Sequence, residues 1–186
     1  MKKFLQLLCV LIFATPWVSA QNPDSDRVRF YVQPSAIVAY PGDDFDTVGG
    51  VSVAAGVTFA RNHSVELEYL GFETERRRRW SEYELEFEYL FAAYKYRFAI
   101  TEKFSVQAGV FLGRFEQKMS PAEYGTWYYN PQPDDDFAGG LSGTVEYQFT
   151  PHISFVGGIK MIGQAATRFT TSGTVGVAQA GAKFSF

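Results

Sequence analysis

Apolar and polar side chains alternate at every second position along most of the chain after residue 27. The alternation covers the segments 28–40, 51–59, 65–69, 104–112, 137–149, 153–161 and 178–186. A period of two predicts β-strands that each carry one apolar face. Segment 83–98 is also read as a strand, although its pattern is mixed, and it brings the predicted number of strands to eight.

The connections between these strands alternate in length. Short connections are predicted at 60–63, 100–103 and 150–152, and long ones at 41–47, 73–82, 118–136 and 165–173. In an antiparallel meander this order puts every short turn at one end and every long loop at the other. That asymmetry is typical of outer-membrane β-barrels, which have short periplasmic turns and longer extracellular loops.

Alternation alone does not say which face points outward, because a soluble lipocalin-like barrel has the same period with its apolar face inside. Two features favour the membrane. The opposite face is rich in small residues such as Ser52, Gly56 and Gly109, which suit the crowded inside of an eight-stranded barrel. Phenylalanines also gather beside the short turns, as in an interfacial aromatic belt. The predicted fold is an all-β, eight-stranded, antiparallel up-and-down transmembrane β-barrel.

The first twenty residues resemble a secretory signal. Lys2 and Lys3 precede an apolar stretch, and Val18, Ser19 and Ala20 offer small residues for cleavage. We therefore expect a signal peptide at 1–20, a polar lead-in at 21–27 and the barrel at 28–186. The single cysteine lies in the signal, so no disulfide or thiol chemistry is expected. The net charge of −3 argues against a nucleic-acid partner.

The chain ends on Gly181-Ala182-Lys183-Phe184-Ser185-Phe186. With this ending and its architecture, the mature chain resembles the small outer-membrane barrels of the OmpX/Ail and OmpA-like group over its whole length. The resemblance implies an outer-membrane location, a monomer, and contact with membrane lipids and lipopolysaccharide. It also implies that Gly181, Phe184 and Phe186 are read by the outer-membrane assembly machinery. Ala180 departs from the group, in which a polar residue usually precedes the glycine.

The inward phase of the strands carries charges, and an eight-stranded barrel is only wide enough for side chains. Buried charges must be paired, so we predict interior ion pairs that plug the barrel rather than line a polar channel. An apolar conduit like that of OmpW is disfavoured, because the interior is predicted to be charged. The residues of the predicted pairs are Arg29, Glu66, Glu68, Glu86, Glu88, Lys95, Arg97, Glu146, Lys160 and Lys183.

One strand makes this assignment awkward. Glu86 and Glu88 occupy even positions, whereas Lys95 and Arg97 occupy odd ones. Both sets face inward only if the strand slips by one residue, which predicts a β-bulge between Leu90 and Ala93. The alternative is that the glutamate end already stands above the membrane.

The second long loop carries four consecutive arginines, Arg76, Arg77, Arg78 and Arg79, followed by Trp80. Guanidinium groups bind phosphates and sulfates in a bidentate manner. The predicted partners are lipopolysaccharide phosphates or an anionic host glycan or protein. Flanking glutamates and loop aspartates offer intramolecular pairing as an equal alternative. In the longest loop, an aromatic cluster is a second candidate for recognition. It consists of Tyr124, Trp127, Tyr128 and Tyr129.

Catalysis is not expected. His63 and His152 both belong to short turns, and no histidine lies near the long loops. The Asp134–Asp136 triplet lacks a regular calcium-ligand spacing, so no metal or cofactor is expected. The favoured function is surface interaction of the adhesion or immune-evasion type. A structural or passive-permeability barrel is the alternative, and a lipid A-modifying enzyme ranks third.

Overall fold

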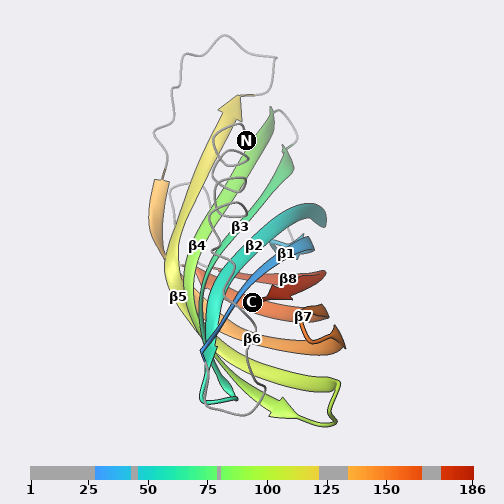
Figure 1. The fold of residues 1–186 in the computed structure, drawn as a ribbon. Helices are drawn as coiled ribbons and strands as arrows, with labels where there is room; N and C mark the ends of the chain where they lie inside the picture. The colour runs from blue at the N-terminus through green and yellow to red at the C-terminus, as the bar shows by residue number, and fades with distance from the viewer. Residues whose placement is uncertain (1–27, 43–45, 79–80, 122–133, 165–172) are drawn as a thin grey trace.

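The computed structural model describes residues 28–42, 46–78, 81–121, 134–164 and 173–186. Eight antiparallel strands follow one another around a closed barrel (Figure 1), as the alternation predicts. They are β1 (Arg29–Tyr40), β2 (Val48–Phe59), β3 (His63–Arg78), β4 (Ser81–Ala99), β5 (Phe104–Pro121), β6 (Asp134–Thr150), β7 (Ile153–Gln164) and β8 (Gly173–Ser185). Within the described ranges, no helix is long and apolar enough to cross a membrane.

The barrel closes because its strands are staggered. A path through paired residues that starts at Val48 of β2 and runs once around the barrel returns to β2 at Thr58, ten residues along. The path passes through Ala39, Val177, Lys160, Ser142, Gly109, Lys95 and Ser64. A stagger of this kind tilts the strands and brings side chains from all of them into one narrow interior.

The apolar face of the strands points outward. Leu67 of β3, Leu112 of β5 and Ile159 of β7 are all at least 60% exposed, and they belong to the alternating apolar rows. The opposite rows are buried, for example Gln33 and Ser52. This is the predicted orientation, and it is the reverse of a soluble barrel.

The exposed apolar band has the height of a bilayer. On β4 it runs from Leu90 to Phe98, within the span of roughly 9–11 residues that a strand needs to cross the hydrocarbon core. Beyond it, the next outward positions are charged: Glu88 on β4, Arg114 on β5 and Asp135 on β6. Charge on a lipid-facing position is costly, so the band ends here.

Four strands continue past this boundary. Strands β3 to β6 have 16 to 19 residues, whereas the other four have 12 or 13. In Figure 1, β3, β4 and β5 rise above the rest of the barrel. The predicted long loop at 73–82 is therefore wrong, because β3 continues to Arg78 and β4 begins at Ser81. The predicted loop at 118–136 is shortened to the segment between Pro121 and Asp134.

Strand β4 has no bulge. Its pairing is continuous with β3 from Ser81 to Tyr96 and with β5 from Tyr83 to Ala99, so the predicted slip between Leu90 and Ala93 is wrong. Odd positions face inward from Leu85 to Lys95. Glu86 and Glu88 consequently face outward and do not take part in interior pairs. They lie beyond Leu90, where the lipid-facing band has already ended, so no slip is needed to keep them out of lipid.

Candidate functional site

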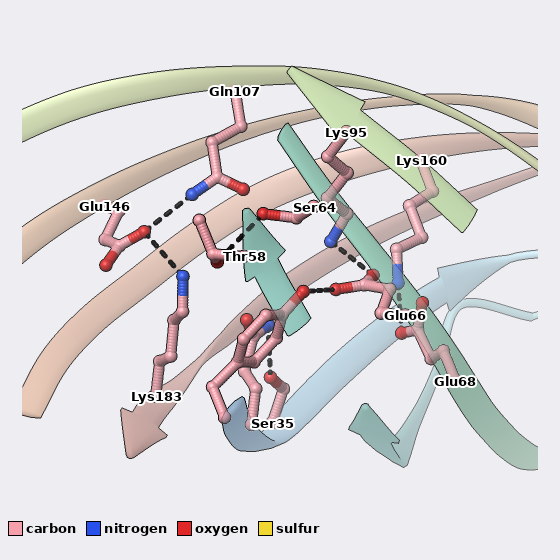
Figure 2. Close-up of polar contacts among 12 residues, drawn as sticks. Ser35, Thr58, Ser64, Glu66, Glu68, Lys95, Gln107, Glu146, Lys160 and Lys183 are labelled. Carbon is pink, nitrogen blue, oxygen red and sulfur yellow. Dashed lines mark hydrogen bonds and ion pairs between the residues drawn. The ribbon is translucent and has the colours of Figure 1, made fainter. Parts of the chain in front are cut away.

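The half of the interior nearest the short turns is filled by paired charges, which we call the ionic layer (Figure 2). Lys95 Nζ lies 2.5 Å from Glu66 Oε1, and the phenol of Tyr31 donates a hydrogen bond of 2.6 Å to Glu66 Oε2. Lys160 pairs with Glu68 across the barrel, from β7 to β3. All four charged side chains are almost inaccessible to solvent. In each pair, the partner's opposite charge therefore takes the place of the stabilisation that water would give.

A third carboxylate completes the ionic layer. Glu146 Oε2 accepts hydrogen bonds from Gln107 Nε2 at 2.6 Å and from Lys183 Nζ at 3.1 Å. The Lys183 ammonium also lies 4.4 Å from the centre of the Tyr31 ring, which links this group to the Glu66 pair. Three buried carboxylates are thus matched by three buried lysines.

The other residues of the predicted interior pairs lie elsewhere. Arg29 is exposed at the start of β1. Arg97 faces inward and is half-buried, and its Nε has no hydrogen-bond partner. Glu86 and Glu88 are on the outer surface, as described above.

The other half of the interior is mainly apolar, with Thr74 and Gln117 as buried polar exceptions, contrary to the expectation of a charged interior throughout. Six inward rings form a continuous row, which we call the aromatic ladder. Its contacts have centroid separations of 4.7 Å for Phe91 and Phe111, 5.4 Å for Tyr89 and Phe91, and 5.7 Å for Tyr89 and Phe115. Phe87 stacks on Phe72 at 5.0 Å and continues to Tyr89 at 6.5 Å.

Sequence reasoning missed the aromatic ladder, although a signal was present. From residue 84 to residue 88 the even positions are glutamates, and the odd positions from 85 to 91 are Leu85, Phe87, Tyr89 and Phe91. Apolar and polar residues alternate here as in the other strands, but the apolar residues are on the face that points to the interior and not on the face that points to lipid. The assumption that every apolar row faces lipid hid it.

Three of the four consecutive arginines, Arg76 to Arg78, lie at the end of β3 in the projecting β3–β4 hairpin. Pairing puts Arg76 opposite Tyr83, Arg77 opposite Glu82 and Arg78 opposite Ser81. The backbone therefore carries these arginines in a paired strand, past the end of the lipid-facing band. The remaining predicted recognition residues lie outside the described part of the chain: Arg79, Trp80, Tyr124, Trp127, Tyr128 and Tyr129.

Charged groups on the outer face hold the base of this projection together. Glu88 accepts hydrogen bonds from Lys118 and from the Tyr69 phenol, the latter at 2.7 Å. Partial burial tends to raise the pKa of the Glu88 carboxyl, but these hydrogen bonds outweigh it and hold the pKa below its usual value. The same contact raises the pKa of the Lys118 ammonium. Arg114 pairs with Asp135 on the neighbouring strand.

The C-terminal residues of the predicted assembly signal close the barrel. Phe184 of β8 is opposite Val32 of β1, and the Phe186 amide donates to the Phe30 carbonyl at 2.9 Å. A Cβ on Gly181 would come within 2.2 Å of the Pro34 carbonyl oxygen, so a side chain has no room at this point of the seam.

The two histidines have structural partners at the short-turn end. His63 Nδ1 lies 2.6 Å from the Tyr94 phenol, and His152 Nδ1 lies 3.0 Å from the Ser185 carbonyl oxygen. No group of residues within the described ranges has the composition of a metal site.

Comparisons with known proteins agree with this architecture. The family described as outer membrane protein beta-barrel domain matches residues 6–186. A search of curated proteins found no match. Among solved structures, Neisserial surface protein A superposes with a TM-score of 0.67 at 17% identity, covering 84% of this chain and 97% of the other.

Two further solved structures are similar in fold. Ail of Yersinia pestis, crystallised with the heparin analogue sucrose octasulfate, has a TM-score of 0.50 at 14% identity, with coverage of 86% and 97%. OprG of Pseudomonas aeruginosa has a TM-score of 0.50 at 14% identity, with coverage of 85% and 95%. At such identities the similarity concerns the fold alone.

Proposed function

The chain belongs to the outer membrane protein β-barrel family, and from that membership we propose that it is a surface-interaction barrel whose outer hairpin binds a polyanion. The protein is located in the bacterial outer membrane. The observation that carries the proposal is the position of Arg76 to Arg78, at the end of a paired hairpin beyond the lipid-facing band. Four adjacent guanidinium groups favour a ligand with several sulfates or phosphates.

The length of the hairpin supports this proposal. Strand β4 has eight residues, Ser81 to Glu88, between its upper end and the first charged outward position. At about 3.3 Å per residue, these residues raise the tip by roughly 25 Å along the strand. A binding segment raised in this way is accessible to a large polymer. The bound heparin analogue in the Ail structure shows that a barrel of this fold takes a sulfated ligand, and we extend that ligand class to this chain.

The competing use of the arginines is pairing with nearby carboxylates. Glu82 is opposite Arg77 in the hairpin, and Glu73 and Glu86 are opposite each other further down. Exposed ion pairs are individually worth little, about 0–1 kcal/mol, so a multivalent anion displaces them readily.

Binding to immobilised heparin by the mature protein in nanodiscs without lipopolysaccharide tests the proposal. We expect replacement of Arg76 to Arg79 by serine to weaken binding at least about tenfold and to flatten its salt dependence, because ionic contacts are lost. The matched control replaces Arg29 and Lys103, which are exposed cations at the short-turn end of the barrel, and should bind like the parent. Equal binding by the parent and the arginine variant would refute the proposal.

The same assay with lipopolysaccharide in the nanodisc separates the two sources of anion. If phosphates of the same membrane occupy the arginines, added lipopolysaccharide should compete with heparin. We propose no catalytic role, because both histidines lie at the short-turn end, away from the hairpin. The passive-permeability alternative is supported less well, because the ionic layer is paired and buried.

A further inference from the structure

The turn between β2 and β3 is strained in a way that no other described part of the chain is. Ala60 and Arg61 have φ angles of 46° and 64°, and they are the non-glycine residues with positive φ in the described ranges. The turn comprises three residues, Ala60 to Asn62, between the paired residues Phe59 and His63, and a side chain is disfavoured at positive φ, where glycine is the usual residue. Arg61, at the second position of the turn, therefore makes the fold less stable than glycine would at the same position. The presence of an arginine side chain here requires an explanation.

An aromatic patch lies beside this turn, on the outward face of β2, β3 and β4. It consists of Phe59, His63, Tyr94, Tyr96 and Phe98. The His63 ring stacks on Phe59 at 5.7 Å and meets Tyr96 edge-on at 5.0 Å. Tyr96 in turn packs on Phe98 at 4.8 Å. The imidazole, on β3, is therefore held in a fixed orientation by rings on the two neighbouring strands, β2 and β4.

The polar atoms of this patch are partly used and partly free. His63 Nδ1 is occupied by the Tyr94 phenol, and His63 Nε2 has no partner among the described residues. Asn62 Nδ2 donates to the Tyr96 phenol at 3.5 Å. Arg61 is exposed and forms no ion pair with any described residue, and the exposed charges of the next turn, Glu102 and Lys103, cancel each other. The patch is thus left with one unmatched cation and a free ring nitrogen.

The patch lies at the level of lipid headgroups. Val65 and Leu67, the next two residues after His63 on the same face of β3, are exposed apolar residues of the lipid-facing band. The turn is the first polar segment at the short-turn end of this band. Short turns mark the periplasmic end of such barrels. The headgroups at this level are therefore those of the inner leaflet.

We propose that Arg61, His63 and the surrounding aromatic patch form a binding site for the headgroup of an anionic phospholipid. The guanidinium group and the free imidazole nitrogen contact the phosphate oxygens, and the acyl chains lie over Tyr94 and Leu67. Charge complementarity favours an anionic over a zwitterionic lipid, because the site contributes an unpaired positive charge. The strain at Arg61 is then explained by a function of its side chain.

The second histidine supplies an internal control. The chain has two histidines, and His152 also lies in a short turn, but its Nδ1 is committed to the Ser185 carbonyl oxygen. Mature protein without a histidine tag, labelled with ¹⁵N-histidine, is placed in nanodiscs of phosphatidylcholine with increasing phosphatidylglycerol. We expect the Nε2 signal of His63 to shift in a saturable way and the signals of His152 to stay in place.

Substitution of Arg61 distinguishes a site from a general surface effect. Arg61→Gly removes the cation and relieves the strained turn, so the variant folds at least as stably as the parent in a urea titration. Its His63 signal should need about tenfold more phosphatidylglycerol, equivalent to roughly 1.4 kcal/mol. Arg61→Lys should retain most of the response. The proposal fails if both histidines shift together, if Arg61→Gly responds like the parent, or if inorganic phosphate alone produces the same saturation.

Discussion

Glu68 and Lys160 illustrate what a charge inside a narrow barrel requires. They lie 92 positions apart in the sequence, and each is at least 95% inaccessible to solvent. The membrane and the surrounding strands keep water away from both, so each is stabilised chiefly by the other. Removal of one partner leaves an uncompensated charge, which in a buried site is far more costly than the loss of an exposed pair.

We therefore expect Lys160→Met to destabilise the barrel by about 3 kcal/mol, measured by urea unfolding in detergent micelles. The double variant Glu68→Gln with Lys160→Met should recover most of that loss, because no buried charge remains. Arg114→Ala, which breaks the exposed pair with Asp135, is the control and should cost less than about 1 kcal/mol. A Lys160→Met variant as stable as Arg114→Ala would contradict this account.

Whether a single side chain points to the interior or to lipid follows from the sequence wherever one apolar row is continuous. Glu66, Glu146 and Lys183 could be assigned to the interior because their neighbours on both sides belong to such rows. Their partners could not be assigned. Which lysine meets which carboxylate depends on the stagger between strands, and alternation within one strand carries no information about stagger.

Strand β4 shows that alternation alone does not tell which face of a strand points to the interior, because this depends on what surrounds the strand. Its lower part, from Leu90 to Phe98, has apolar even positions that face lipid. In its upper part, the apolar residues at positions 85, 87 and 89 face the interior, and Glu86 and Glu88 at the even positions are partly exposed. The strand is regular throughout, and only the surroundings change at Leu90. A bulge was predicted because a change of environment was interpreted as a change of phase.

The projecting hairpin was missed for a related reason. Residues 73–82 are mostly charged and show no alternation of apolar and polar positions, which usually indicates a loop. Above the membrane, however, neither face of a two-stranded ribbon needs to be apolar. Pairing between β3 and β4, which continues unbroken to Arg78 and Ser81, is sufficient to extend the strands.

Two glycines on β6 differ in how much space the neighbouring strand leaves for a side chain. A Cβ on Gly140 would lie 1.8 Å from the Met161 carbonyl oxygen of β7, whereas one on Gly143 would have its first neighbour at 4.0 Å. We expect Gly140→Ala to destabilise the barrel by about 2 kcal/mol or to prevent closure, because a backbone atom cannot yield as a side chain can. Gly143→Ala should fold normally. Heat-modifiable migration on gels measures both, and equal behaviour would contradict the expectation.

For the whole molecule, strand number, closure and orientation were all accessible from the sequence. Turn lengths identified the two ends, and the exposed apolar rows identified the lipid-facing side. The division of the interior into an ionic layer and an aromatic ladder was not accessible. The ladder runs from β3 through β4 to β5, so its rings meet only once three strands are placed in register.

That division predicts how the barrel treats ions. The ionic layer fills the periplasmic half with buried pairs, and the aromatic ladder forms an apolar constriction beyond it, which ions cross with difficulty. We expect no steady ion-conducting openings from the mature protein in planar bilayers. The two layers act in series, so replacement of Phe91 and Phe111 by alanine should leave the barrel closed, as should replacement of Glu68 and Lys160 by serine.

Only the combination of both pairs of substitutions should conduct, provided that the variant still migrates as a folded barrel on gels. Eight strands leave an interior that side chains alone can block, so each layer is sufficient by itself. Steady openings from the parent would show that the two layers do not seal the barrel. Openings from the alanine pair alone would show that the ionic layer passes ions, and that the ladder is the sole barrier.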